Sequence, residues 1–204
     1  MIGLRGTGTD SYSVENLFIP EKFAALRDEP TALRENGPLY KLSTNTVFSM
    51  GFAATSLGVA RATLDGAIDL ARGKTPQGIK AMRDNNAVQR LIGRTEAVWR
   101  AARAYLYSTA NEVWHDLSRG ETATERHRVA LRIAATWTIH QSAAVVDTAY
   151  HMAGATAVFN ANGFERRFRD MHTIAQQIQG RDSHYEDVGK AILSGNLDTP
   201  PTAR

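Results

Sequence analysis

Cysteine is absent from this 204-residue chain, and its absence excludes disulfide scaffolds, cysteine-ligated zinc sites and thiol catalysis. No unbroken apolar run approaches the roughly 20 residues of a membrane span. The first residues lack the charged and apolar regions of a signal peptide. With 24 basic and 21 acidic residues, the net charge of +3 is too small to argue for a nucleic-acid partner. These absences favour a soluble, cytoplasmic protein that binds neither membrane nor nucleic acid.

Helical periodicity covers most of the chain. Hydrophobic residues make up 43% of it, enough for the core of one large domain. From Leu42 onward, apolar residues recur every three or four positions, as on one face of a helix. The pattern predicts long helices from about 42 to 73, 84 to 119 and 122 or 124 to 154, with shorter ones over 164–179 and 185–193. We therefore predict an all-α fold, an up-and-down four-helix bundle over residues 37–197.

The third long helix carries the most regular of these patterns. Its expected core positions alternate by four and three residues and are rich in small side chains: Leu131, Ala135, Thr138, Ser142, Val145, Ala149 and Met152. Small side chains let a neighbouring helix approach closely. The pattern therefore predicts that this helix lies at the centre of the bundle.

The first 36 residues differ from the rest. Tyr12 and Val14 keep the alternation of a strand that ends at Pro20, and residues 21–34 have room for a short helix. A lone strand leaves its backbone hydrogen-bonding groups unpaired. We therefore expect residues 1–36 to be a strand-containing remnant of another domain plus a linker, and residues 198–204 to be a disordered tail.

Two short motifs allow a functional and a structural interpretation. Residues 3–8 form a GxxGxG string, but a phosphate-binding loop needs a strand before it and a helix after it, so a turn is favoured. Asp147 and His151 lie four apart, which suits half a metal site or a local pair on one helix. Without an HxxxH, HExxH or ExxH pattern, we expect no metal site.

Charged residues gather at two further places. Arg83, Arg90, Arg94 and Arg103 recur along the second long helix, with Arg100 nearby; they form either a solvated face or a patch for an anion such as a pyrophosphate. Residues 164–172 mix ionic and aromatic side chains, as in a network at the start of a helix. Neither place shows a nucleophile with its base, so these residues alone leave the chemistry open.

Five segments resemble the acyl-CoA dehydrogenase superfamily, and they do so in the family's order. Residues 4–10 and 13–20 are similar to the last strand of its middle β-domain. Residues 57–65 and 82–90 resemble its first two C-terminal helices, and residues 168–172 its Arg-Asp signature. The later pattern, residues 185–189 included, is most similar to the branch that holds reduced-flavin monooxygenases.

This resemblance implies the C-terminal helical domain of a flavoprotein oxidoreductase, without most of its other domains. Relatives bind FAD or FMN between domains and subunits and assemble as tetramers or dimers. The implied partners are therefore a flavin, further copies of the chain, and an acyl-CoA or aromatic small-molecule substrate. The alternative is a catalytically inert helical oligomerisation module or half of a split enzyme.

The resemblance also indicates which chemistry is missing. Dehydrogenases of the family use a glutamate base shortly after the Arg-Asp pair, but residues 175–180 contain no acid, and Phe48 stands at the alternative position. Because an amide is no substitute for a carboxylate base, this favours the monooxygenase branch over dehydrogenation. Gln177 stands where some monooxygenases have a flavin-facing histidine, so it is the candidate catalytic residue.

Two residues are candidates for binding the cofactor. The family's flavin-phosphate loop after the first long helix corresponds to residues 72–78, where Lys74 or Arg72 carries a suitable charge. A second contact in the family comes from a glycine-containing turn of a neighbouring subunit, which corresponds to residues 150–154. The resemblance therefore implies that Lys74 and Gly154 contact the flavin.

Overall fold

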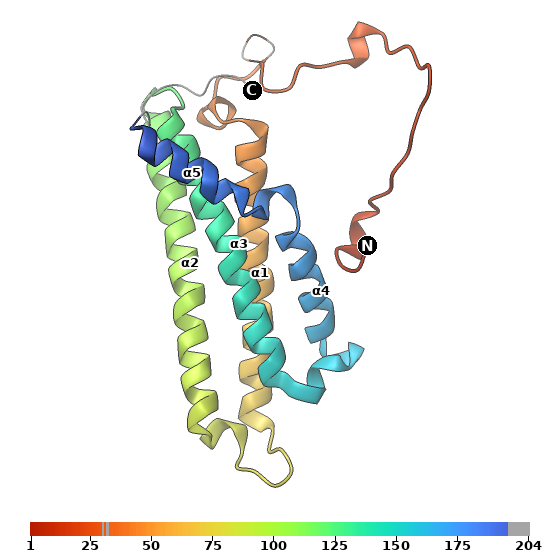
Figure 1. Ribbon diagram of the computed structural model, residues 1–204, viewed down its shortest axis with the longest axis vertical. Coiled ribbons are helices and arrows are strands. Elements are labelled where there is room, and N and C mark those ends of the chain that lie inside the picture. Colours follow the sequence, from red (N-terminus) through yellow and green to blue (C-terminus); the bar gives the residue numbers. More distant parts are fainter. Residues whose placement is uncertain (30, 32, 196–204) are drawn as a thin grey trace.

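The computed structural model describes residues 1–29, 31 and 33–195. This part of the chain contains five α-helices and no strand: α1 (Thr44–Gly73), α2 (Asn86–Ser118), α3 (Glu125–Ala153), α4 (Phe164–Ala175) and α5 (Ser183–Ser194). Helices α1 to α4 run alternately up and down, and α5 crosses the outside of α3 (Figure 1). The predicted all-α, up-and-down bundle is therefore confirmed.

The long helices begin where a side chain can accept a hydrogen bond from the first turn. The Ser43 hydroxyl accepts from the Thr46 N–H, and the Asn85 side chain accepts from the Ala87 N–H. Thr124 and His127 form a reciprocal capping box at the start of α3. The predicted start of α2 at Asp84 is wrong by two residues, because Asp84 lies in a preceding 3-10 turn.

The core forms mainly between α1 and α3. Six of the seven core positions predicted on α3 are buried, and only Met152 is partly exposed. They meet small residues on α1, and the hydroxyls of Ser56 and Ser142 lie 3.3 Å apart between the two helices. The close approach expected from the small residues of α3 is therefore observed.

On α2 the apolar repeat predicts a core face of Val88, Leu91, Thr95, Val98, Ala102 and Tyr105, and this prediction is only partly correct. Thr95 and Ala102 are buried as expected, but Tyr105 is 38% exposed and Leu106 takes its place in the core. The buried face then continues to Leu117. An α-helix has 3.6 residues per turn, so over 33 residues the buried face drifts away from a strict three-four pattern.

Among the described helices, α1 alone has the length and composition of a membrane span, with a mean hydropathy of 1.2 over its most apolar window. In the bundle it contacts α2, α3 and α4. Ten of its residues are buried, among them Leu57 and Leu64. Packing within the bundle therefore accounts for the apolar character of α1.

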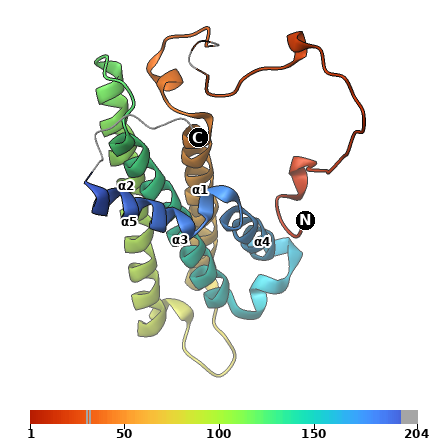
Figure 2. The same cartoon turned by 45° about the horizontal axis from the view of Figure 1, so that its top comes forward.

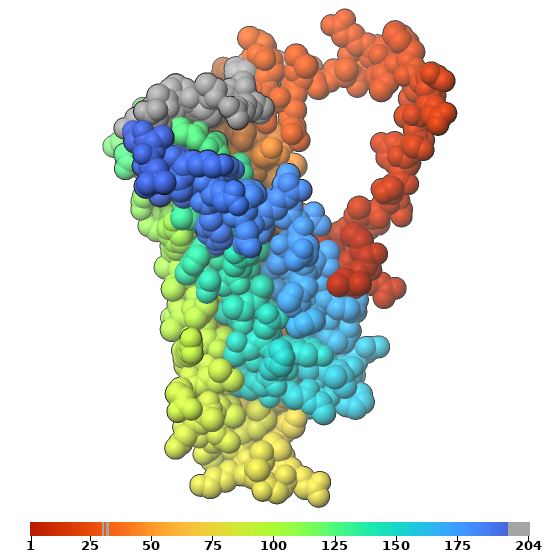
Figure 3. Space-filling model, viewed as in Figure 1, coloured from red at the N-terminus to blue at the C-terminus, as the bar shows by residue number. Residues whose placement is uncertain are grey.

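The N-terminal segment does not form the predicted strand, nor the short helix expected over residues 21–34. Its described part contains 3-10 turns at Arg5–Thr7 and Glu21–Phe23, and Tyr12 and Phe18 are 91% and 84% exposed. After the turn Arg5–Thr7, the segment stands away from the bundle as an arm (Figure 2, Figure 3). A strand needs a neighbour for its backbone hydrogen bonds, and none lies beside this segment in the described residues. The predicted tail, residues 198–204, lies outside the described part.

Candidate functional site

The start of the chain is fastened to α4. The Leu4 N–H donates to Asp170 Oδ1 over 2.6 Å, and the Arg169 guanidinium donates to the Ile2 carbonyl over 2.5 Å. A Cβ on Gly3 would lie 2.2 Å from the Arg169 carbonyl oxygen, so only glycine fits there. The Arg-Asp pair noted in the sequence thus clamps a backbone segment 166 residues away, a partner that no local pattern shows.

This clamp creates a hollow on the surface. Residues 4–7 line one wall, and Arg166, Arg169 and Asp170 of α4 line the other. The GxxGxG string therefore forms a turn docked on a helix, as the structural interpretation expected, although no strand follows it. On the rim, a hydrogen bond from Arg169 holds the pKa of the Glu165 carboxyl below its ordinary value, and the nearby Arg166 and Arg5 add to this effect.

The two predicted cofactor-binding residues lie at one corner of the bundle, where α1 and α3 both end. Lys74 follows the last residue of α1, and its ammonium donates to the Ala153 carbonyl over 3.1 Å and to the Thr156 hydroxyl over 2.7 Å. Gly154 follows directly, with a φ of 59° that favours glycine. Both acceptors are neutral, so in the described structure the positive charge of Lys74 has no anionic partner.

Gln177, the predicted catalytic residue, lies elsewhere in the fold. It is half-buried and precedes the 3-10 turn Ile178–Gly180, which packs on α1 and α3. The Gly180 carbonyl accepts from the His140 ring over 2.8 Å, which fixes this turn to the middle of α3. His140 and Ala153 are 13 residues apart along α3, about 20 Å at 1.5 Å per residue. The structure thus separates Gln177 from the corner at Lys74.

A buried polar network lies beside the Gln177 turn. The Thr136 hydroxyl donates to the Gln179 carbonyl over 3.3 Å and lies 2.9 Å from His184 Nδ1. A hydroxyl has one proton, so both contacts are satisfied together when Nδ1 carries a hydrogen and donates to Thr136. Burial is the main cause that lowers the pKa of His184, and Arg132 lowers it further. This network anchors α5 to α3.

The suggested pairing of Asp147 with His151 is wrong. The His151 ring bonds only the backbone carbonyl of Asp147, over 2.7 Å. The Asp147 carboxylate instead accepts from His172 Nε2 of α4 over 2.8 Å. The Phe168 ring lies tilted against those of His172 and Tyr150, with ring centroids 4.3 Å and 4.6 Å away. These residues therefore join α3 to α4 and offer no half of a metal site on α3.

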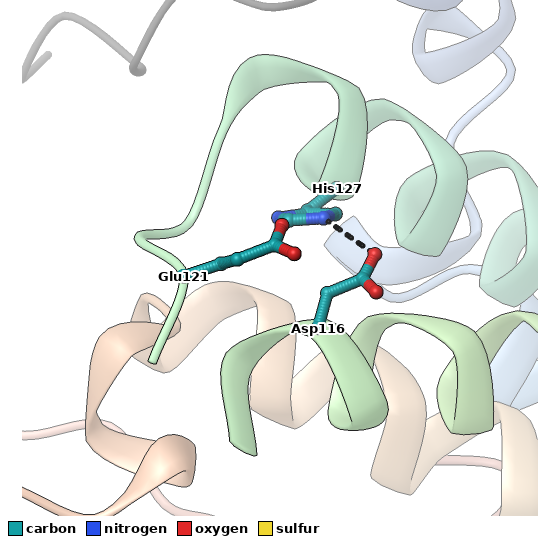
Figure 4. A group of neighbouring side chains, drawn as sticks. All are labelled: Asp116, Glu121 and His127. Carbon is teal, nitrogen blue, oxygen red and sulfur yellow. Dashed lines mark hydrogen bonds and ion pairs between the residues drawn. The ribbon is translucent and has the colours of Figure 1, made fainter. Parts of the chain in front are cut away.

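Three residues at the turn between α2 and α3 come close enough to suggest metal ligands: Asp116, Glu121 and His127 (Figure 4). His127 Nδ1 accepts the Thr124 N–H, so Nε2 carries the proton and donates to Asp116 Oδ2 over 3.3 Å. The Arg119 guanidinium donates to both carboxylates. All three groups are therefore already engaged, and the cluster serves as a hydrogen-bonded brace of the turn.

The four arginines of α2, together with Arg83 in the 3-10 turn before it, are solvated rather than gathered into a pocket. All five are exposed. Arg100 pairs with Glu96 over 2.7 Å, and Arg103 lies over the Tyr107 ring at 4.7 Å. None of them lines the hollow beside α4, and the solvated interpretation of this face is favoured over the anion patch.

Comparison with known proteins connects this geometry to a family. The sequence profile of "Acyl-CoA dehydrogenase, C-terminal domain" matches residues 50–180. The chain is 28% identical over 201 residues to indole-3-acetate monooxygenase from Acinetobacter baumannii, covering 98% of this chain and 51% of that protein. It is 27% identical over 182 residues to the oxygenase subunit HsaA of a flavin-dependent monooxygenase from Rhodococcus jostii, covering 84% of this chain and 47% of that protein. The chain thus spans about half the length of these curated relatives.

Solved structures share the fold. The 3-HSA hydroxylase from a Rhodococcus species superposes with a TM-score of 0.83 at 22% identity, over 100% of this chain and 53% of the other. XiaF from a Streptomyces species, solved with FADH2 and glycerol, gives a TM-score of 0.71 at 17% identity, over 81% of this chain and 42% of the other. At these identities the likeness shows the architecture alone.

Proposed function

The chain belongs to the acyl-CoA dehydrogenase family, as its C-terminal helical domain, and from that premise we propose that it is the helical half of a flavin-dependent monooxygenase. The observation that carries the proposal is that the curated relatives named above are monooxygenases whose matches cover 98% and 84% of this chain. The absence of an acid at residues 175–180 supports oxygenation over dehydrogenation, which needs a carboxylate base.

We place the flavin phosphate at the corner formed by Lys74 and Gly154. Lys74 Nζ is held by two neutral acceptors and keeps its charge uncompensated in the described structure, which suits a phosphate oxygen. Gly154 adopts a positive φ without a side chain, so a ligand can approach the backbone there. Both residues thus belong to one corner of one chain, and either FAD or FMN presents the phosphate that this corner would hold.

The role proposed for Gln177 is orientation. Its carboxamide offers two donors and one acceptor, so it can hold the polar edge of a flavin ring or a substrate hydroxyl, but it cannot remove a proton as a carboxylate does. A reduced flavin supplies the activation of oxygen in such a site. The substrate is an aromatic small molecule in this proposal, since the relatives include indole-3-acetate monooxygenase.

The direct test adds FMN or FAD to the purified chain and follows protein-bound flavin absorbance. Lys74→Ala should weaken flavin affinity by about tenfold to a hundredfold, because a hydrogen bond to a charged group contributes about 1.5–3 kcal/mol. Lys80→Ala is the matched control, since Lys80 is a nearby exposed lysine outside the corner. Thr156→Val removes a partner of Lys74 but keeps its charge, and should retain most of the affinity.

Absence of flavin binding by the wild-type chain at micromolar concentration would refute a self-sufficient flavin site. Equal losses in Lys74→Ala and Lys80→Ala would refute the placement of the phosphate at this corner. A loss in Thr156→Val as large as in Lys74→Ala would show that the shape of the corner, and not the lysine charge, is what matters.

The second candidate function is an inert oligomerisation module or half of a split enzyme. The arm favours it, because Tyr12, Phe18, Phe23 and Leu26 are each at least 74% exposed, which is unusual for large apolar side chains without a partner. Light scattering tests it. The module should form dimers or tetramers, whereas a clean monomer would count against this candidate and against the oligomer proposed for the flavoenzyme.

A further inference from the structure

The hollow between the N-terminal segment and α4 carries two arginines whose guanidinium groups lack a hydrogen-bonded partner in the described residues. Arg5 comes from the N-terminal wall and Arg166 from α4. Neither guanidinium forms a hydrogen bond or an ion pair within the described residues. Their neighbours are engaged: Arg169 bonds Glu165 over 2.8 Å and the Ile2 carbonyl, while Asp170 Oδ1 accepts the Leu4 N–H.

The clamp fixes the position of one arginine relative to the other. The Leu4 N–H meets the Asp170 carboxylate, and Leu4 itself has a φ of 51°, which turns the chain so that Arg5 begins the 3-10 turn Arg5–Thr7. Gly3 lies too close to the Arg169 carbonyl for any side chain. The two arginines thus reach one hollow from elements far apart in the sequence but held rigidly together.

The beginning of α4 adds to the positive character of the place. Gly163 precedes the helix with a φ of 67° and provides no side-chain cap, so the N–H groups of the first turn have no side-chain acceptor. Arg166 stands in that turn and also lines an adjoining polar hollow with Asn160 and Asn162. The positive end of a helix dipole favours an anion beside it.

We propose that this hollow binds an oxyanion, a carboxylate or phosphate group, between the guanidinium groups of Arg5 and Arg166. The planar guanidinium fork matches the two oxygens of such a group and donates two parallel hydrogen bonds to it. Asp170 in the hollow and Glu165 on its rim both oppose an anion. The Leu4 N–H already bonds one oxygen of Asp170, and Arg169 bonds Glu165. The proposal concerns this chain alone and holds whether or not the Lys74 corner binds flavin.

An NMR titration at low ionic strength tests the site. Sodium phosphate or sodium phenylacetate should shift the backbone amide signals of Gly6, Thr7 and Arg166 in a saturable way. Arg5→Ala and Arg166→Ala should each raise the apparent Kd at least about tenfold, since each removes hydrogen bonds to a charged ligand. Arg94→Ala is the matched control, because Arg94 is an exposed arginine of α2 outside the hollow.

Gly3→Ala provides a perturbation that leaves every charge in place. The added Cβ would meet the Arg169 carbonyl oxygen, so the N-terminal wall must move away from α4. Because Gly3 lies outside the helices, the bundle should keep its circular dichroism spectrum while anion affinity falls. An unchanged anion affinity in Gly3→Ala would overturn the proposal, and so would an unchanged affinity in both arginine variants. A loss of the amide shifts in Arg94→Ala as large as in Arg5→Ala and Arg166→Ala would overturn it as well.

The source of the oxyanion is resolved by comparing ligands. Shifts produced by phenylacetate at lower concentration than phosphate support the site and assign it to the carboxylate of an organic acid. Shifts produced by FMN but not by riboflavin support it and assign it to a flavin phosphate. Equal shifts from FMN and riboflavin would overturn it, because the phosphate would then contribute nothing. Loss of flavin binding in Lys74→Ala alone leaves this inference intact and bears only on the proposed function.

Discussion

The stability of the protein should depend on pH through His184. This side chain is 6% exposed and donates through Nδ1 to Thr136. Burial lowers its pKa in the folded state, as do Arg132 of α3 and the preceding Arg181, while Asp187 of α5 opposes them in part. An unfolded chain lets the same imidazole take up a proton at its ordinary pKa of about 6.5.

The direction of the pH dependence follows from which state, folded or unfolded, binds the proton more readily. Above the ordinary pKa, the imidazole is neutral in both states, and His184 does not reduce the free energy of unfolding. As the pH falls below about 6.5, the unfolded state gains a proton that the folded state resists, so the free energy of unfolding decreases. One proton gives a slope of at most about 1.4 kcal/mol per pH unit, and the decrease ends at the lower folded-state pKa.

Urea unfolding followed by far-ultraviolet circular dichroism between pH 5 and pH 8 measures this slope. His184→Asn is the matched variant, because the asparagine amide keeps a donor for Thr136 but does not titrate. The two proteins are compared by how steeply their free energy of unfolding changes with pH. A loss of packing energy in His184→Asn that is the same at every pH does not affect this slope. If the wild type and His184→Asn lose stability with the same slope below pH 6.5, His184 does not remain neutral in the folded state and the reasoning fails.

Three further predictions concern the helices that position the candidate site, each measured by urea unfolding at pH 7. Thr124→Ala should lower the free energy of unfolding by about 1 kcal/mol through loss of the α3 capping box, and no change would show that the box is dispensable. Trp99→Phe should cost about 0.5–1.5 kcal/mol, because it removes the hydrogen bond from the indole to the Leu57 carbonyl; a stabilised variant would contradict this. Ile174→Ala should cost about 2–5 kcal/mol in the core, whereas Ile178→Ala, at a side chain 53% exposed, should change stability by less than about 0.5 kcal/mol, and equal losses would show that burial is not the cause.

Local sequence patterns were sufficient for the helices. The positions Leu131, Ala135 and Ser142 were predicted to face the core of α3 and do so, because an α-helix brings residues three and four apart onto one face whatever surrounds it. The start of α2 lies two residues later than expected, at Asn86, because the local pattern does not reveal the 3-10 turn Met82–Asp84 before it.

Local patterns failed where the partner lies elsewhere in the chain. The expected strand at Tyr12 and Val14 has no neighbour to complete its hydrogen bonds and stays an exposed arm. Asp147 was placed beside His151 by spacing, yet its carboxylate meets His172, because α4 docks against α3. The candidate site shows the same limit: the resemblance pointed to Lys74 and Gly154, and the Arg-Asp pair was noted without its partner.

The sequence by itself determined the helices, the small-residue face of α3 and the family to which the chain belongs. The tertiary structure decided that Lys74 bonds the carbonyl before Gly154, that the turn after Gln177 is held at His140 in the middle of α3, and that Asp170 holds Leu4. The physical reason is that helical periodicity is a property of neighbouring residues, whereas a hydrogen bond across 166 residues depends on how separate helices pack.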